Sequence, residues 1–402
     1  GGPGHGAREG FPLGQRGRAS GGRLPPGRRE RNARLMRVAL VHDWLTGMRG
    51  GERVLEELLV LFPDAEIFTL LHVPGAVSPA IERRPIHTSW LQHAPGAARG
   101  YRNYLPLFPA AIASLDLAGV ELVISVSHAV AKGVRVPAGV PHLCYCLTPM
   151  RYVWDRYDDY FAAGRANAVV RAVMPLVASR LRAWDRRRAQ GVTRFVAISE
   201  HVRERIARAY GRVAGVVYPP VALDRFAPGG AREDFYLVVS ALVPAKRIDL
   251  AIDACVAAGR RLTVVGQGPE FPRLTRRARP MVTFVPDADD QTVARYYARC
   301  KALIIPGVED FGLTAVEAQA AGAPVIAFGE GGVRESVIGV NGTTPLPKAT
   351  GVFFESQTVE SLVAAIGRCE ATTFEREALA ASVARFGVER FRREFRAEVD
   401  AL

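Results

Sequence analysis

Short apolar runs alternate with amphipathic stretches along most of the chain. From residue 36 onward, each apolar run is followed by a turn containing glycine or serine and then by an amphipathic segment. This order predicts parallel strands joined by covering helices. Ten strands are predicted, at residues 37–42, 65–71, 122–127, 142–147, 194–199, 235–242, 262–268, 281–286, 302–307 and 324–329.

The pattern occurs twice, on either side of a connection rich in proline and glycine. At 402 residues the chain exceeds one ordinary core, so two domains are expected. The segment 216–234 lacks helical periodicity, which places the boundary near residue 220. We therefore predict two doubly wound α/β domains, 36–220 and 221–385, with a cleft between the carboxyl ends of their strands, where such sheets bind ligands.

The first 35 residues have a different composition from the rest. They hold eight Arg and two Glu, which contribute +6 to the chain's formal net charge of +13. With little to pack, this segment is predicted to be disordered. An Arg-rich leader is compatible with a transit peptide or with the basic arm of a nucleic-acid binder. We favour an upstream extension that precedes a native start at Met36.

The sequence indicates neither a membrane-spanning helix nor a cysteine-based metal site. No run approaches the ~18 uninterrupted apolar residues of a membrane-spanning helix. The five cysteines are scattered and form no CxxC pair, which is typical of a reducing cytoplasm and predicts no metal site. They are Cys144, Cys146, Cys255, Cys300 and Cys369.

Two candidate sites follow strands of the first domain. Gly47, Gly50 and Gly51 lie in a loop that opens an amphipathic helix, where free N–H groups favour an anion. Turn geometry alone explains such glycines equally well. His128 directly follows a predicted strand, so it is a candidate to bind a substrate or to move a proton. The alternative is a histidine that caps the next helix.

The turn after the first strand of the second domain carries two cations. Lys246 and Arg247 immediately precede a predicted helix, where phosphate oxygens would find both cations and N–H groups. A solvated Lys-Arg pair is the alternative. The nearby "VVGQGPEF" holds only a GxG fragment, which is too little for a dinucleotide fingerprint.

The segment "EDFGLTAVE" places two carboxylates on one loop and helix. Glu309 lies in the loop after a predicted strand, and Glu317 lies about a turn into the following helix. Thr314 and Glu317 also match a capping box, so Glu317 could serve its helix alone. Carboxylates in this arrangement suit vicinal hydroxyls of sugars better than a hydrolytic acid and base, which flank a scissile bond. The N–H groups of 312–314 would then face a diphosphate.

From Met36 to its end the chain resembles glycosyltransferase family 4, the retaining enzymes of GT-B fold. It is most similar to bacterial mannosyltransferases of O-antigen and exopolysaccharide assembly. The segments that carry the resemblance are "VHDWLTGMRGGERVLE", "SVSHAVAKGV", "YCLTPMRYVWD", "VAISEHVRERI", "VVYPPVALDRF", "VVSALVPAKRIDLAI", "VVGQGPE" and "PGVEDFGLTAVEAQAAGAPVIAFGEGGVRE".

The resemblance implies a fold and a set of site residues. The fold is two facing Rossmann-like domains, the first for the acceptor and the second for the nucleotide sugar, with a helix at 386–402 crossing back to the first. The implied catalytic residues are Glu309 and His128, on the transferred sugar, and Lys246, on the diphosphate. Glu317 would bind the ribose. The remaining implied residues are Arg247, Gly312, Leu313, Thr314, Gly331 and Gly332 for the donor, and Gly50, Gly51 and Arg151 for the acceptor and phosphates.

The resemblance also implies chemistry without a metal or other cofactor, and it has two departures. Many relatives carry Arg at the position of Ala241, and others carry His at that of Leu147. Arg247 is a candidate to replace the missing phosphate cation. The implied activity is transfer of a hexose, with mannose from GDP-mannose favoured, to a lipid-linked or growing cell-surface glycan.

Three alternatives to this activity remain open. They are a UDP-sugar-dependent glucosyl or galactosyl transferase, an enzyme like the sugar-nucleotide 2-epimerases, and a basic nucleic-acid-binding protein. The arginine-rich segment 165–190 is equally typical of a helix on anionic lipid and of a solvated surface helix. We expect no nucleic-acid partner and a cytoplasmic protein, peripheral at the inner face of the plasma membrane if that helix binds lipid.

Overall fold

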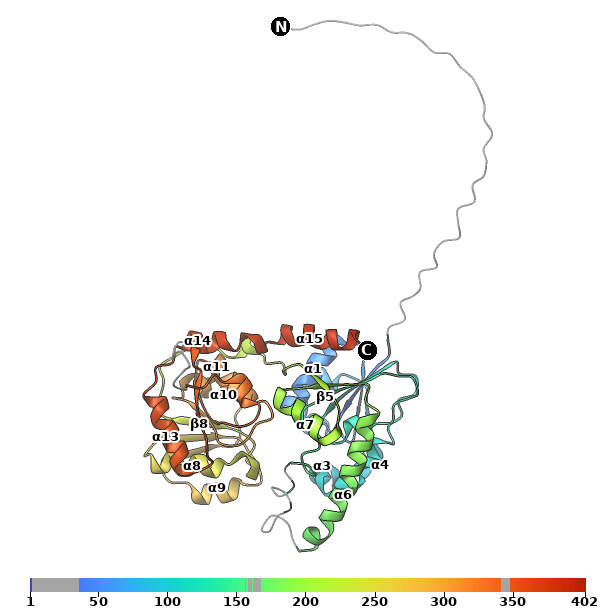
Figure 1. Ribbon diagram of the computed structural model, residues 1–402, viewed down its shortest axis with the longest axis horizontal. Helices are drawn as coiled ribbons and strands as arrows, with labels where there is room; N and C mark the ends of the chain where they lie inside the picture. Colours follow the sequence, from blue (N-terminus) through green and yellow to red (C-terminus); the bar gives the residue numbers. More distant parts are fainter. Residues whose placement is uncertain (2–35, 156, 158–160, 162–167, 341–347) are drawn as a thin grey trace, which may run out of the picture. The chain divides into compact units, whose positions relative to one another are not determined.

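The first half of the chain forms a seven-stranded parallel sheet in the computed structural model, which describes residues 1, 36–155, 157, 161, 168–340 and 348–402 (Figure 1). The strand order is β3-β2-β1-β4-β5-β6-β7. Central strands such as β1 and β4 are buried along their whole length, as expected when helices cover both faces of a parallel sheet. The strands are β1 (Val38–His42), β2 (Glu66–Thr69), β3 (Ile86–Thr88), β4 (Leu122–Ser127), β5 (His142–Cys146), β6 (Arg194–Ala197) and β7 (Ala214–Val216).

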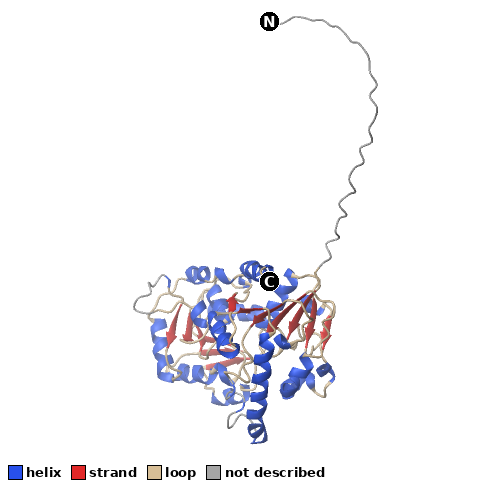
Figure 2. Ribbon diagram, turned by 45° about the vertical axis from the view of Figure 1, so that its right-hand side comes forward, coloured by secondary structure: helices blue, strands red, loops and turns tan. Residues whose placement is uncertain are grey.

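The helices of this half connect and flank the strands (Figure 2). They are α1 (Gly50–Leu61), α2 (Pro79–Glu82), α3 (Ala97–Gly100), α4 (Phe108–Ile112), α6 (Ala168–Gln190) and α7 (Glu200–Tyr210), with 3₁₀ turns η1 (Trp90–His93), η2 (Tyr101–Leu107), η3 (Ala131–Gly133) and η4 (Leu223–Arg225). Local sequence sets both ends of α7. The Ser199 hydroxyl accepts from Val202 N–H at the start, and Gly211 ends the helix in the left-handed conformation.

The second half forms a six-stranded parallel sheet in the order β10-β9-β8-β11-β12-β13. Its strands are β8 (Tyr236–Val239), β9 (Leu262–Val265), β10 (Val282–Val285), β11 (Leu303–Ile305), β12 (Val325–Phe328) and β13 (Gly351–Phe354). Its helices are α8 (Ile248–Ala257), α9 (Phe271–Arg277), α10 (Asp290–Arg299), α11 (Leu313–Ala320), α12 (Val333–Ser336), α13 (Val359–Glu370) and α14 (Arg376–Ser382), with 3₁₀ turns η5 (Pro244–Lys246) and η7 (Ala384–Phe386). The predicted α/β class with two parallel sheets is confirmed.

A last helix, α15 (Val388–Asp400), packs against the first domain (Figure 1). The rings of Phe391 and Phe395 each lie 5.7 Å from the ring of Tyr145 in β5. Arg392 Nε donates to Glu57 Oε2 of α1 at 2.7 Å. The end of the chain therefore contributes to the core of the N-terminal domain.

Composition led to predictions about membrane-spanning helices and about the first 35 residues. Among the described residues, no helix is both long and apolar enough to cross a bilayer. The leader predicted to be disordered lies outside the described residues, apart from its first residue.

Candidate active site

The carboxyl ends of the two sheets meet through the loop that follows β11. Asp310 of this loop pairs with Arg151, which follows β5, with Nη2 and Oδ2 3.0 Å apart. Its backbone oxygen accepts a hydrogen bond of 2.6 Å from the hydroxyl of Ser199, which follows β6. The segments that follow β5, β6 and β11 therefore contact one another at the edge where parallel α/β sheets bind ligands.

Glu309 and Lys246 form an ion pair at this edge. The Lys246 ammonium donates to Oε1 at 2.6 Å and to Oε2 at 2.5 Å. Glu309 follows β11 and Lys246 lies in η5, after the adjacent strand β8. The structure thus brings together two of the three residues predicted to be catalytic.

Arg247 contacts Asp249 and Gln357 rather than Glu309. Its Nε lies 3.4 Å from Asp249 Oδ1, and its Nη1 donates to Gln357 Oε1 at 3.5 Å. The residue adopts a φ of +50°, a conformation that costs a side-chain-bearing residue about 1 kcal/mol or more. The structure therefore separates the two neighbouring cations: Lys246 faces Glu309, whereas Arg247 faces the side of its own helix.

The start of α11 lies beside the start of α1. Gly312 is the N-cap of α11 with a φ of +89°, and no side chain caps the helix there. A Cβ placed on Gly50, the first residue of α1, would lie 2.8 Å from Leu313 Cδ1. The first N–H groups of a helix have no intrahelical acceptor, so Leu313 and Thr314 offer theirs to an anion at this junction.

Glu317 is held inside the domain rather than at the helix start. Its Oε2 accepts a hydrogen bond of 2.9 Å from the Tyr297 hydroxyl. Burial raises the pKa of the Glu317 carboxyl to about 7, although the Tyr297 hydrogen bond and the charges of Arg53 and Arg225 act in the opposite direction. The capping box expected from Thr314 and Glu317 is wrong, because α11 begins at Leu313 and its N-cap is Gly312.

Gly331 and Gly332 support the loop that carries Glu309. Gly332 N–H donates to the Glu309 backbone oxygen at 2.8 Å. A Cβ on Gly331 would lie 2.5 Å from that same oxygen, and one on Gly332 would lie 2.2 Å from the Asp310 oxygen. Only glycine permits this backbone contact, so both residues have a structural role irrespective of any ligand.

His128 lies next to a buried carboxylate that the sequence did not single out. Its ring Nδ1 is 3.0 Å from Oδ2 of Asp43, which follows β1. The same carboxylate accepts the backbone N–H groups of four successive residues, His128, Ala129, Val130 and Ala131, at 2.6–2.9 Å. Burial would raise the pKa of Asp43, but the charge and hydrogen bonds of His128 outweigh it and lower that pKa. This site belongs to the N-terminal domain.

The remaining predicted residues lie around the same junction. A Cβ on Gly51 would lie 3.0 Å from both His42 Nε2 and Leu147 Cδ1. Burial lowers the pKa of His42, which favours its neutral form. Arg151 engages Asp310 and thereby links the domains.

Four further residues belong to the site. Asp43 follows β1 and has the same strand-end signal as His128. Asp310 adjoins Glu309, and Glu335 lies in the quoted segment "GEGGVRE". Tyr297 is a buried side chain of the amphipathic helix α10, and only the tertiary structure reveals its contact with Glu317.

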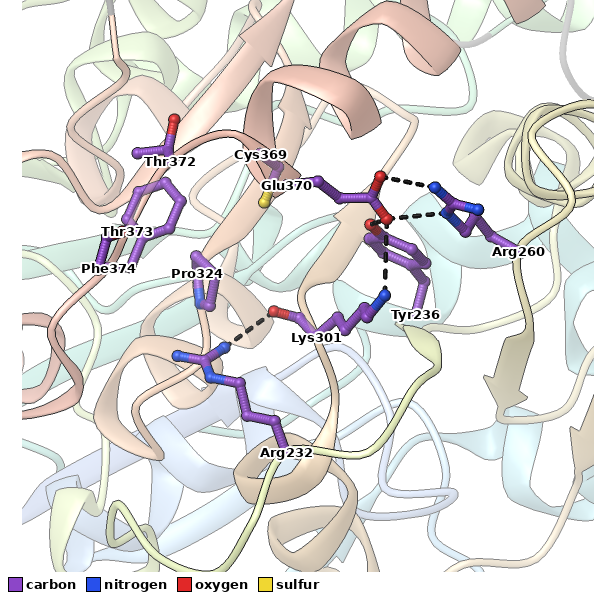
Figure 3. A pocket seen from close by; sticks show the side chains of 10 residues that line it. All are labelled: Arg232, Tyr236, Arg260, Lys301, Pro324, Cys369, Glu370, Thr372, Thr373 and Phe374. Carbon is purple, nitrogen blue, oxygen red and sulfur yellow. Dashed lines mark hydrogen bonds and ion pairs between the residues drawn. The ribbon is translucent and has the colours of Figure 1, made fainter.

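A pocket of about 530 Å³ lies at the opposite edge of the second sheet (Figure 3). Tyr236 begins β8 and Pro324 immediately precedes β12, so the pocket is at the amino ends of the strands. Glu370 accepts two hydrogen bonds of 2.8 Å from Arg260 and lies 3.6 Å from Lys301 Nζ, while Arg232 donates to the backbone oxygens of Lys301 and Gly322 at 2.9 and 2.8 Å. The pocket is therefore not the expected ligand site. No cluster of three or more His, Cys, Asp or Glu side chains suited to a metal occurs among the described residues.

Comparison with known proteins gives matches to glycosyltransferases. Residues 224–383 match the family model described as "Glycosyl transferases group 1". The D-inositol 3-phosphate glycosyltransferase of Frankia alni is 34% identical over 188 residues, which cover 38% of this chain and 46% of that protein. The GDP-mannose-dependent alpha-(1-6)-phosphatidylinositol monomannoside mannosyltransferase of Mycobacterium tuberculosis is 30% identical over 208 residues, covering 44% and 53%. The chain thus spans about half the length of these relatives.

Solved structures match over most of the chain. The sucrose-phosphate synthase of Thermosynechococcus elongatus gives a TM-score of 0.66 at 19% identity, covering 91% of this chain and all of that one. The lipopolysaccharide outer core galactosyltransferase WaaB gives 0.62 at 15% identity, covering 91% and 99%. These likenesses show the GT-B fold. Together the matches show a domain of the group 1 glycosyltransferase model at residues 224–383, within a chain of GT-B fold.

Proposed function

We propose that the chain is a retaining, family 4 glycosyltransferase that moves a hexose from a nucleotide sugar to a lipid-linked or growing cell-surface glycan. The observation that carries the proposal is the Lys246–Glu309 pair beside the uncapped start of α11, with Glu317 farther along the same helix. This order suits a sugar, a diphosphate and a ribose in turn. GDP-mannose is the favoured donor, and one relative is named as GDP-mannose-dependent.

The proposed roles follow from the chemistry of each group. Glu309 accepts hydrogen bonds from hydroxyls of the donor sugar, and Glu317 accepts them from the ribose. The ammonium of Lys246 and the N–H groups at the start of α11 stabilise the charge that develops on the departing diphosphate. Binding of the donor therefore requires Lys246 to share its ammonium between Glu309 and a phosphate oxygen.

The transfer itself is a substitution at the anomeric carbon. The bond from that carbon to the phosphate oxygen breaks while a bond to the acceptor oxygen forms on the same face. The proton of the acceptor hydroxyl passes to the leaving phosphate oxygen, so no protein nucleophile is needed. His128, held by Asp43, contacts the transferred sugar, and Gly50 and Gly51 allow the acceptor side to approach the phosphates. The proposed reaction uses no metal or other cofactor.

The acceptor side of the proposal places the protein at an anionic membrane surface, on the cytoplasmic side. The solvent face of α6 carries Val173 and Leu176, which are 51% and 57% exposed, together with the exposed arginines Arg171, Arg180 and Arg187. Exposed apolar side chains flanked by cations suit the headgroup region of an anionic bilayer.

The test is release of nucleoside diphosphate from a panel of nucleotide sugars, with and without lipid-linked acceptors. The full chain is compared with Glu309→Gln and with Glu204→Gln, which alters an exposed carboxylate on α7. We expect acceptor-stimulated release from GDP-mannose that Glu309→Gln loses and Glu204→Gln keeps. No release from any donor would contradict the transferase, whereas preference for a UDP-sugar would contradict only the choice of GDP-mannose.

A further inference from the structure

The two loops that carry predicted donor residues of the second domain both contact one helix start of the first domain. The loop after β11 places Asp310 between two guanidinium groups: Arg151 Nη2 lies 3.0 Å from Oδ2, and Arg205 Nη1 pairs with Oδ1. The Asp310 backbone oxygen accepts from Ser199 Oγ at 2.6 Å. Ser199 is the N-cap of α7 and Arg205 lies within α7.

The second loop, at Gly331 and Gly332, leads into α12, and Glu335 of α12 reaches the same helix. Its Oε2 accepts from Glu200 N–H at 2.8 Å, and its Oε1 accepts from His201 N–H at 3.0 Å. These are the first N–H groups of α7, which have no acceptor within their own helix. A carboxylate of the second domain therefore completes the cap of a helix in the first domain, where the helix dipole also favours negative charge.

Glu309 lies between these two contacts. Its backbone oxygen accepts from Gly332 N–H, three residues before Glu335, and Asp310 is its neighbour in sequence. The loops also touch through a parallel bridge between Glu309 and Gly331. A displacement of either contact with α7 is thus transmitted to the backbone of Glu309.

Arg205 is suited to fix this position. Its side chain is 6% exposed, and its Nε donates to Asp155 Oδ2 of its own domain at 2.8 Å. A guanidinium anchored on one side by Asp155 presents its remaining N–H groups to Asp310 in a fixed direction.

We propose that Arg205 and Ser199 are positioning residues for Glu309, so that the N-terminal domain sets the geometry of the donor-sugar carboxylate through Asp310. This inference rests on the proposed function for its effect on turnover. Glu317 contacts Tyr297 and lies near the charges of Arg53 and Arg225. None of these residues contacts Asp310 through the interactions described above. Loss of the α7 contact therefore changes turnover, whereas the nucleoside remains bound.

The experiment compares Arg205→Met and Asp310→Asn with Arg203→Met. Arg203 lies on the same helix, is 50% exposed and pairs with Glu200 of its own domain, so it is a matched control. We expect kcat to fall by roughly 10- to 100-fold in the first two variants, as for small misplacements of a catalytic group. The Kd values of GDP and UDP should stay within about twofold of the wild-type values, which corresponds to a change of less than ~0.5 kcal/mol in binding free energy.

Hydrogen exchange of the peptide covering residues 303–316, without any ligand, gives a readout independent of catalysis. We expect exchange roughly tenfold faster in Arg205→Met and Asp310→Asn than in the wild type or Arg203→Met. If the wild type turned over no donor, the proposed function would fail, and the exchange comparison would still decide this inference. Exchange equal to that of the control, or a parallel loss of nucleotide affinity and kcat, would overturn it.

A double-mutant cycle separates positioning from general damage. If Arg205 acts through Asp310, the variant carrying both Arg205→Met and Asp310→Asn should be no slower than the worse single variant. Asp310→Asn keeps the size of the side chain, so this variant alone still tests the proposal if Arg205→Met does not fold. Additive losses would show that the two residues act independently and would contradict the proposal.

Discussion

Replacing Glu317 by Gln should stabilise the protein at alkaline pH while weakening its proposed binding of ribose. The carboxyl is buried against the Tyr297 hydroxyl, and its pKa rises from 4.5 to about 7. At about 1.4 kcal/mol for each pH unit between these values, ionisation costs the folded state ~3 kcal/mol. Gln has the same shape, can accept from Tyr297 and does not ionise.

The sign of the pH dependence follows from proton binding. Between pH 4.5 and about 7 the folded chain holds a proton on Glu317 that the unfolded chain has released. Its contribution to stability is therefore complete below pH 4.5 and is lost as the pH rises through about 7. Thermal unfolding at half-unit steps from pH 4.5 to 8.5 should show no difference between Glu317→Gln and wild type at the acid end. At pH 8.5 the variant should melt roughly 6–12 °C higher.

The control is Glu204→Gln, whose exposed carboxylate should leave the melting profile unchanged. Equal pH profiles for wild type and Glu317→Gln, or a variant that melts lower at pH 8.5, would refute the reasoning about burial. In the same preparation, the affinity for GDP should fall, because an amide is a poorer acceptor for two ribose hydroxyls than a carboxylate. Stability and ligand binding should thus change in opposite directions.

Three further predictions concern the surroundings of the site. Glu309→Gln should lower turnover by roughly 100-fold or more and change stability by less than ~1 kcal/mol, measured by kcat and melting temperature; equal losses would mean a structural carboxylate. Gly332→Ala should cost ~1–3 kcal/mol of stability, because its Cβ would meet the Asp310 oxygen at 2.2 Å, whereas Gly229→Ala, with nothing within 4 Å, should stay near the wild type. Asp43→Asn should destabilise the protein by ~1–3 kcal/mol near neutral pH. The pKa of Asp43 is lowered from 3.8 in the folded protein, so the higher stability of the wild type should diminish as the pH falls below 3.8. Melting temperatures measured across this pH range test the prediction.

The strands show what periodicity can and cannot predict. All ten predicted strands are present, and the three that were missed, β3, β7 and β13, are edge strands. An edge strand is flanked by a neighbour on one side only, so it needs no long apolar run; "IHT" and "AGV" of β3 and β7 are three residues each. The continuous apolar run that identifies a central parallel strand is absent from such short segments.

For the site, the sequence indicates where single residues lie in the fold but not which residues contact one another. Strand ends can be counted from sequence, so His128, Lys246 and Glu309 could be assigned to strand ends from the sequence alone. Which side chains pair could not be predicted, because the contacts span long stretches of sequence; that of Asp43 with His128 spans 85 residues. The local capping rule for Thr314 and Glu317 failed because Gly312, which adopts a left-handed conformation, starts the helix two residues earlier.

The proposed donor carries a negatively charged diphosphate, yet the segment 309–317, from the loop after β11 into α11, holds three carboxylates. The structure offsets the negative charge of two of them with cations and that of the third by burial. Glu309 is paired with the Lys246 ammonium, and Asp310 is paired with Arg151 and Arg205. Glu317 has no such direct cation partner among the described residues, and burial raises its pKa to about 7, which favours the protonated form. Because a like charge within a few ångströms repels an anion strongly in a partly buried site, these arrangements let a diphosphate approach the start of α11 while the carboxylate oxygens remain available to hydroxyls.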